Sequence, residues 1–196
     1  QILACAPAQN LVHRAELQRD GIRLNIRRIA GEAQSEFLAS GDIWFHPIHL
    51  SIGPNGGVYI ADFYREIIED YSAIPRYLQQ QYGLDDGKDH GRVWRLVHND
   101  MPKPLSPNMS KLRNDELIRE VASPRFWRRQ TARRLLLERA RHSDDQPARI
   151  TLPADSTTGA INALYTLDGL ARLDDNVLEL ALGHSEPGVR RHALRL

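Results

Sequence analysis

The chain has 196 residues, of which 41% are hydrophobic and 26% charged, and its formal net charge is +1. This composition is that of a globular protein, and the length allows one large domain or two small ones. The balanced charge gives no overall field to draw nucleic acid or a membrane surface, and no apolar run approaches the roughly 18–20 residues of a membrane-spanning helix.

Both ends of the sequence look like cuts within a longer protein. The chain begins at Gln1 without a signal-peptide pattern, and residues 189–196 are still apolar at helical spacing. We therefore expect a fragment. Cys5 is the single cysteine, so there is no internal disulfide, no Cys-x-x-Cys-His haem attachment site and no zinc spacing, and one thiol fits either redox compartment.

The first half of the chain has the period of β-strands. Residues 2–6 are short and apolar, residues 10–14 follow Pro7, and residues 22–29 alternate between apolar and basic side chains. That alternation predicts a half-buried edge strand whose charged face discourages unwanted pairing.

A hairpin is predicted next. Two β-prone runs, residues 47–52 and 58–63, flank Asn55-Gly56, and both turn residues accept the positive φ of a tight antiparallel connection. The second run ends in the polar residues Asp62, Tyr64 and Arg65, where a strand would leave its sheet.

The remaining segments of this half complete a predicted four-stranded unit. Residues 66–69 are strand-like or a tight turn, residues 74–83 are a short helical insertion, and residues 92–97 alternate like a strand. One incomplete unit of three strands and one of four, at a repeat of about 40–50 residues, indicate the closing blades of a β-propeller over residues 1–98. Two blades cannot close a ring, so we expect further blades upstream and poor stability of this arc alone.

The second half is predicted to be helical. Residues 99–110 carry Pro102, Pro104 and Pro107 and form a predicted linker. Apolar residues then recur at helical spacing over 111–122, from 125 onward after the Ser123-Pro124 start signal, over 157–170 and over 175–182, with a further start at 185–187. Short helices that each bury little alone are typical of a HEAT or armadillo-type α-solenoid, here over residues 111–196.

An ordered series of motifs along nearly the whole chain resembles a known group. The motifs in the first half are residues 4–7, 10–14, 36–40, 44–47, 53–65 and 89–95; those in the second half are 123–132, 168–170 and 187–193. Together they resemble the end of the propeller and the first HEAT repeats of the membrane-bound dehydrogenases of planctomycete and verrucomicrobial bacteria. Those proteins pair a sugar-dehydrogenase-like propeller with HEAT repeats and often a c-type haem domain.

The resemblance implies a module of a periplasmic or otherwise extracytoplasmic oxidoreductase acting on a sugar-like substrate. It implies electron transfer to a quinone of the PQQ type or to haem elsewhere in the parent protein, with no cofactor in this stretch. It also implies protein partners docked on the helical repeats, and it gives no reason to expect nucleic acid.

Two residue pairs at predicted strand ends are candidates for a site at the propeller rim. His13 and Arg14 follow an apolar pair, and the alternative is a salt bridge and a loop histidine. Trp44 and His46 precede a predicted inner strand, where His46 could take the proton that hydride removal from an alcohol releases. The alternative for His46 is backbone geometry imposed by Pro47.

Asp62, Tyr64 and Arg65 form the sharpest candidate cluster. The carboxylate would orient a base or ligand, and Arg65 would clamp an anionic group with two hydrogen bonds. The alternative is an Asp that caps a turn and pairs with Arg65 between blades. His49 is interpreted as a packing residue within a strand.

Two charged stretches are interpreted as surface. Residues 85–89 contain three aspartates but lack the spaced ligands and closing Glu of an EF-hand, and Lys88 intrudes, so a solvated turn is favoured over a calcium loop. Residues 125–141 carry seven arginines against Glu138. A solvated or partner-facing helix is favoured over an anion or nucleic-acid face, with Arg128, Arg129 and Arg133 toward water.

Two function hypotheses follow. In the first, the propeller rim contributes His46 and Asp62 to catalysis, with His13, Arg14, Trp44, Tyr64 and Arg65 binding substrate or cofactor, and no metal. In the second, propeller and solenoid form a non-catalytic scaffold for proteins or glycans. Convergence of Asp62, His46 and Arg14 would favour the enzyme, and their use in separate salt bridges would favour the scaffold.

Overall fold

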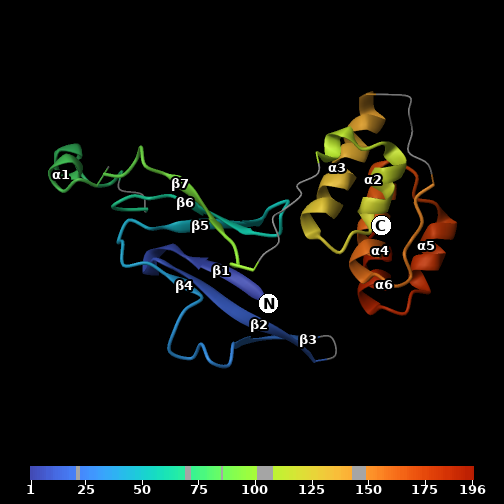
Figure 1. Ribbon diagram of the computed structural model, residues 1–196, viewed down its shortest axis with the longest axis horizontal. Helices are drawn as coiled ribbons and strands as arrows, with labels where there is room; N and C mark the ends of the chain where they lie inside the picture. The colour runs from blue at the N-terminus through green and yellow to red at the C-terminus, as the bar shows by residue number, and fades with distance from the viewer. Residues whose placement is uncertain (21–22, 69–71, 85, 101–107, 143–148) are drawn as a thin grey trace. The chain divides into compact units, whose positions relative to one another are not determined.

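The computed structural model describes residues 1–20, 23–68, 72–84, 86–100, 108–142 and 149–196. The chain divides into two compact units, one of residues 1–53 and 57–102 and the other of residues 54–56 and 103–196. Within the described ranges the fold is mixed, with two antiparallel sheets and six α-helices (Figure 1). The two units are called the β unit and the helical unit.

The first sheet is built around one long strand. It contains β1 (Ile2–Ala6), β2 (Leu11–Asp20), β3 (Arg23–Arg28) and the two-residue β4 (Leu38–Ala39). Strand β2 pairs with β1 on one edge, and β3 and β4 share its other edge. The sequence predicted β1 with its observed bounds, but β2 extends six residues beyond the predicted 10–14, because its second half pairs with β3.

The second sheet has three strands in chain order, β5 (Pro47–Ile52), β6 (Val58–Asp62) and β7 (Arg92–Leu96). The predicted hairpin between β5 and β6 is present, but its connection differs from a two-residue Asn-Gly turn. The Gly53 amide donates to the Gly57 carbonyl at 2.9 Å, and of the loop residues between them Gly56 has a positive φ of 81°. A three-residue loop with one left-handed glycine is a common alternative to the primed turns.

The predicted four-stranded unit is wrong in its third strand. Residues 66–68 belong to no strand, with Glu66 in a bend, and Glu69 lies outside the described residues. Strand β7 pairs directly with β6 instead. The chain between them contains α1 (Arg76–Gln81), which lies within the predicted insertion at 74–83.

Within the β unit, the two sheets are in contact through β1 and β5. A one-turn 3-10 helix, η1 (Pro7–Gln9), follows β1 and ends at Asn10, whose φ of 57° is left-handed. The Asn10 amide donates to the carbonyls of Ile43 at 2.9 Å and Phe45 at 2.8 Å. These bonds fix the start of the second sheet against the turn of the first. No closed ring or barrel is present in the described residues.

The helical unit begins with a 3-10 turn and continues with five α-helices. These are η2 (Met109–Lys111), α2 (Asn114–Val121), α3 (Phe126–His142), α4 (Thr157–Gly169), α5 (Asp175–Leu182) and α6 (Pro187–Ala193). The predicted helices are all present, and the bounds of α5 are as expected. The last helix ends at Ala193, before the end of the apolar pattern.

Two helical pairs repeat at a fixed offset. Helices α5 and α6 begin 61 residues after α2 and α3, from Asn114 to Asp175 and from Phe126 to Pro187. The same offset relates two arginines with the same role: Arg129 donates to the carbonyl of Ser123 at 2.7 Å, and Arg190 donates to that of His184 at 2.7 Å. Helix α4 contacts both α3 and α6.

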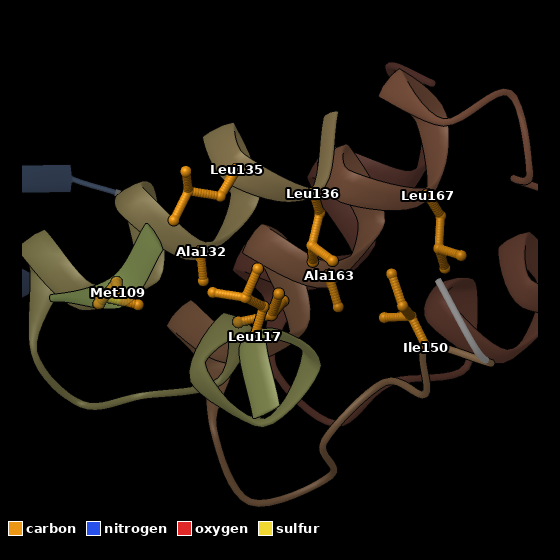
Figure 2. Packing of buried hydrophobic residues seen from close by; sticks show 9 residues of the cluster. Met109, Leu117, Ala132, Leu135, Leu136, Ile150, Ala163 and Leu167 are labelled. Atoms are coloured by element: carbon orange, nitrogen blue, oxygen red, sulfur yellow. The ribbon is translucent and has the colours of Figure 1, made fainter. Parts of the chain in front are cut away.

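The core of this unit comes from every helix. Figure 2 shows Leu117 of α2, Leu136 of α3 and Ala163 and Leu167 of α4 converging with Met109 and Ile150. A second cluster joins α4, α5 and α6 through Leu164, Ala181 and Val189. Burial is therefore shared between neighbouring helices rather than completed within one pair.

Some predictions concern residues outside the described ranges. These are the prolines of the linker (residues 101–107) and Asp85 of the aspartate-rich turn.

Candidate functional site

The polar cluster of the β unit is centred on Asp62, the last residue of β6. The residue is 3% exposed, and its side chain is fully buried. Oδ1 accepts from the backbone amides of His46 at 2.9 Å and Tyr64 at 3.1 Å. Oδ2 accepts from Arg92 Nε at 3.1 Å and Trp94 Nε1 at 3.0 Å. We call the six residues Trp44, His46, Asp62, Tyr64, Arg92 and Trp94 the Asp62 cluster.

Arg92 is the cation of this cluster. It is the first residue of β7 and lies directly across from Asp62 in the strand register. Its guanidinium carbon lies 3.7 Å from the centre of the Tyr64 ring and 4.9 Å from that of Trp94. Its Nη2 also contacts the exposed Asp42 at 3.2 Å. The planar guanidinium is therefore held by stacking as well as by charge.

The aromatic side of the cluster depends on an unusual backbone. Tyr64 has a φ of 49°, in the left-handed region that residues other than glycine seldom occupy. Its ring meets Trp44 edge-on at 5.6 Å and His90 at 6.4 Å. The Trp44 indole N–H donates to the carboxylate of Glu66. The turn at Tyr64 thus places three rings and a guanidinium together at the end of the sheet.

His46 is buried immediately before β5, with 7% of its surface exposed. Its Nδ1 donates to the carbonyl of Pro7 at 2.9 Å. Its Nε2 is buried and has no hydrogen-bond partner in the described ranges. A buried nitrogen of this kind normally has a partner, so it is the atom of the cluster that a further group could satisfy.

The charges of the cluster favour an ionised Asp62. Burial raises the pKa of Asp62, but the hydrogen bonds from Trp94, the His46 amide and Arg92 together outweigh it and lower the pKa below its usual value. Burial lowers the pKa of Arg92, but Asp62 more than compensates, so that pKa is raised. At neutral pH the pair is a carboxylate and a guanidinium, and Asp62 already accepts four hydrogen bonds.

Arg65 does not pair with Asp62 as the sequence analysis considered. Its guanidinium carbon lies 4.4 Å from the centre of the Phe63 ring, and its Nε is buried without a hydrogen-bond partner in the described part of the chain. Arg92 pairs with Asp62 instead. The antiparallel register of β6 and β7 places Arg92 directly opposite Asp62, whereas Arg65 follows Asp62 on the same chain segment beyond the end of β6.

His13 and Arg14 belong to a separate set of ion pairs. His13 Nδ1 lies 2.7 Å from Glu36, whose other oxygen contacts Arg28 at 2.6 Å. Arg14 pairs with Glu32 and lies 4.8 Å from the centre of the Phe37 ring. The pKa of Glu36 is lowered, first by Arg28 and then by His13. These contacts join the strand β2 to the loop before β4, and they are not part of the Asp62 cluster.

Two expectations about single residues are wrong. His49 is exposed on β5 rather than packed, as are Ile48, Ser51 and Ile52 of the same strand. Arg129 is buried, with 8% exposed, because its side chain caps the carbonyl of Ser123; Arg128 is half-buried against Glu120. Part of the arginine-rich run thus stabilises the helical pair internally.

Sequence reasoning missed Arg92 and Trp94 as members of the cluster. The sequence predicts only that both lie on a strand with alternating side chains. The signal that could have found them is the antiparallel register of that strand against residues 58–62. A hairpin-type pairing of 92–96 with 58–62 places residues of the same face opposite Asp62 and Ile60.

An open, largely apolar hollow of about 270 Å³ lies in the β unit. Phe45, Ile60 and Trp94 line it together with residues 38–40 of the first sheet. Trp94 borders both this hollow and the Asp62 cluster. The hollow can therefore accept apolar side chains of a neighbouring segment, next to the polar groups of the Asp62 cluster.

Among the described residues, no three acidic, histidine or cysteine side chains are grouped to hold a metal ion. The helices in the same ranges include none that is both long and apolar enough to cross a membrane.

A family model described as a domain of unknown function (DUF7133) matches residues 1–100, just over half of the chain. The chain belongs to the DUF7133 family. The match covers the β unit, including both sheets and the whole Asp62 cluster. No curated protein and no solved structure matches this DUF7133 chain.

Proposed function

We propose that this DUF7133 chain is the binding part of a larger extracytoplasmic protein of the dehydrogenase-like kind, and that the reacting groups lie elsewhere in that protein. In this proposal the two sheets are closing blades of a propeller, and the helices are HEAT-type repeats that dock a protein partner. The sugar-like substrate and the quinone or haem belong to the rest of the protein. Cys5 is the chain's single cysteine, so its own residues cannot provide the two thiols of a c-type haem attachment.

The propeller assignment is supported by the arrangement of the sheets. Both are small and antiparallel, they follow one another along the chain, and they touch through β1 and β5. The two sheets differ from the four-stranded blade of a typical propeller: the second has three strands, and in the first β3 and β4 both pair with β2. Polar groups gather where β6 ends, as expected of a blade rim.

The repeat assignment is supported by the 61-residue offset between α2–α3 and α5–α6 and by the equivalent contacts of Arg129 and Arg190. Helix α4 contacts both α3 and α6, as helices of neighbouring stacked repeats do. Stacked repeats of this kind present a continuous surface for a partner.

The observation that carries the binding role is the state of Asp62. Four donors occupy its carboxylate, and its lowered pKa keeps it ionised, so it has little capacity to accept a proton from a substrate. His13 and Arg14 are held in ion pairs of their own. These polar residues are used to hold the β unit together, which favours the scaffold.

A second candidate function is favoured by the buried Nε2 of His46. A histidine whose Nδ1 donates to a carbonyl presents its other nitrogen as an acceptor when the ring is neutral. Such an atom could take the proton of a substrate alcohol during hydride removal. In that case His46 is the base of a dehydrogenase and Asp62 positions it through the backbone amide.

The two candidates are separated by His46→Gln in the full-length protein, assayed for dye-linked oxidation of a panel of sugars and alcohols. The binding role predicts a turnover within about twofold of the wild type, because His46 then only packs within the β unit and donates a hydrogen bond to the Pro7 carbonyl, and it touches no reacting group. A loss of about a hundredfold or more, the range that general-base removal produces, with unchanged melting temperature and KM, would overturn it in favour of catalysis by His46.

A further inference from the structure

Helix α3 carries arginines of two kinds. Arg128, Arg129 and Arg139 are bound to groups of the helical unit, the last to the carbonyls of Leu112 and Ser110. Arg133 and Arg141 have no ion pair within the described ranges. The guanidinium carbon of Arg133 instead lies 5.5 Å from the centre of the Tyr165 ring on α4. These two cations are therefore available to a partner.

Two adjoining hollows follow these cations. One, of about 240 Å³, lies between α3 and α4 and is lined by Gln130, Arg133, Thr158 and Tyr165 among others. The other, of about 300 Å³, continues along α3 from Gln130 and Arg133 to Arg141. Their acidic lining residue is Glu138, which Arg134 holds at 2.8 Å. We call the two hollows together the basic groove.

The positive side of the groove continues toward α6. The Tyr165 hydroxyl and Nδ1 of His192 form a hydrogen bond of 2.9 Å. Burial lowers the pKa of His192, and the charges of Arg191 and Arg195 lower it further. His192 is thus neutral at neutral pH, and the positive charge on this side comes from the two arginines beside it.

We propose that the basic groove binds an acidic, extended segment of a protein partner, with Arg133 and Arg141 each holding a carboxylate. This deepens the docking role given above and rests on it. Guanidinium groups match carboxylates with paired hydrogen bonds. Eight helical residues separate the two arginines, a rise of about 12 Å, which about four residues of extended peptide span.

The lining between the two cations suits a peptide better than a nucleic acid. Gln130 and Thr158 offer hydrogen bonds of the kind a peptide backbone uses. A single-stranded nucleic acid binds through successive open aromatic faces. The aromatic ring lining the groove, that of Tyr165, already has Arg133 over it and His192 against its edge at 5.5 Å.

The test uses the full chain and a fluorescein-labelled peptide of ten glutamates, followed by anisotropy at low and high salt. The double variant Arg133→Gln/Arg141→Gln is expected to weaken binding about fivefold to tenfold, at up to about threefold for each exposed ion pair. Salt is expected to weaken wild-type binding, because the contacts are exposed to solvent. Arg119→Gln, which removes a charge from the exposed face of α2, is the matched control and is expected to change affinity by less than twofold.

Three results would overturn the proposal: no binding of the glutamate peptide, an equal loss in the Arg119→Gln control, or tighter binding of a ten-nucleotide thymidine strand, which would assign the groove to nucleic acid. None of these alters the turnover of the His46→Gln variant, so a failure of the acidic-segment proposal is distinguishable from a failure of the binding role. Circular dichroism of each variant shows whether the helices are retained.

Discussion

Asp62 illustrates how one buried carboxylate can join three segments of a sheet. Its partners come from the residue before β5, the turn after β6 and two positions of β7. Hydrogen bonds to a charged group contribute more than neutral ones, at about 1.5–3 kcal/mol each after the exchange of hydrogen bonds with water is counted. The carboxylate therefore holds strand β7 in register against β6.

We expect Asp62→Asn to lower the free energy of unfolding by about 1–3 kcal/mol at pH 7, because an amide cannot accept from Arg92 and Trp94 as a carboxylate does. The pKa of Asp62 is lower in the folded than in the unfolded state, so its contribution is full above the unfolded pKa of about 3.9 and is lost as the pH falls further. The difference between wild type and variant should hence persist from pH 7 to 5 and shrink below about pH 4. Urea unfolding followed by circular dichroism measures it.

Asp42→Asn is the matched control for this experiment. Asp42 contacts the same guanidinium, at 3.2 Å, but its side chain is 41% exposed. An exposed ion pair contributes about 0–1 kcal/mol. Equal effects of the two substitutions, or a difference that grows on acidification, would contradict the role assigned to Asp62.

At the scale of the elements, the repeated arginine explains how short helical pairs are fixed. Arg129 and Arg190 each reach back six residues to a carbonyl in the turn before their own helix. Those carbonyls lie in the turns that follow α2 and α5, one residue beyond the C-cap of each helix. The arginine thus joins the two helices of a pair.

We expect Arg129→Met to destabilise the helical unit by about 1–3 kcal/mol, because it leaves the carbonyl of Ser123 without its donor. Methionine keeps most of the apolar volume of the side chain. Thermal unfolding followed at 222 nm is the measurement. The control, Arg134→Met, removes an exposed arginine that pairs with Glu138 one turn along the same helix, and its effect should stay within about 0.5 kcal/mol.

Local patterns predicted the elements well where one face is apolar. The β-prone runs 47–52 and 58–63 and the start signals at Ser123-Pro124 and 185–187 correspond to observed strands and helices. Long-range pairing was not predictable in the same way. The extension of β2 depends on β3, and the burial of Arg129 depends on a carbonyl in another segment, so propensity alone placed both incorrectly.

The candidate site could be predicted only in part for the same reason. His46, Asp62 and Tyr64 were found because they flank predicted strands, and the structure brings them together with Trp44. His13 and Arg14 have the same local signal but lie in other contacts. Arg92 was missed because the pairing of β7 with β6, which places it opposite Asp62, was not predicted.

At the scale of the whole molecule, the β unit leaves much apolar surface uncovered. Leu24 and Ile26 of β3 are each 65% exposed, and Val93 of β7 is 68% exposed. Both strands lie at the edge of their sheets. Exposed apolar side chains on open edges are sites for pairing with further strands.

We expect residues 1–98, expressed alone, to self-associate, with an average mass that rises with concentration in sedimentation experiments. Val93→Lys is expected to reduce the association, since a charge on an edge strand opposes pairing. Gln80→Lys, at an exposed position of α1 away from any strand edge, is a control for added charge. A monomer with a sharp, cooperative thermal transition would contradict the expectation that this unit needs neighbouring blades.

The indole of Trp94 gives the β unit an optical reporter of its own. Its N–H donates a hydrogen bond to Asp62, so protonation of that carboxylate changes the electric field across the fluorescent indole ring. Trp44 is bonded to Glu66 in the same way, whereas Trp127 lies in the helical unit. Replacing Trp44 and Trp127 by phenylalanine would leave one emitter, whose wavelength of maximum emission during an acid titration would follow the ionisation of a single buried acid in the native protein.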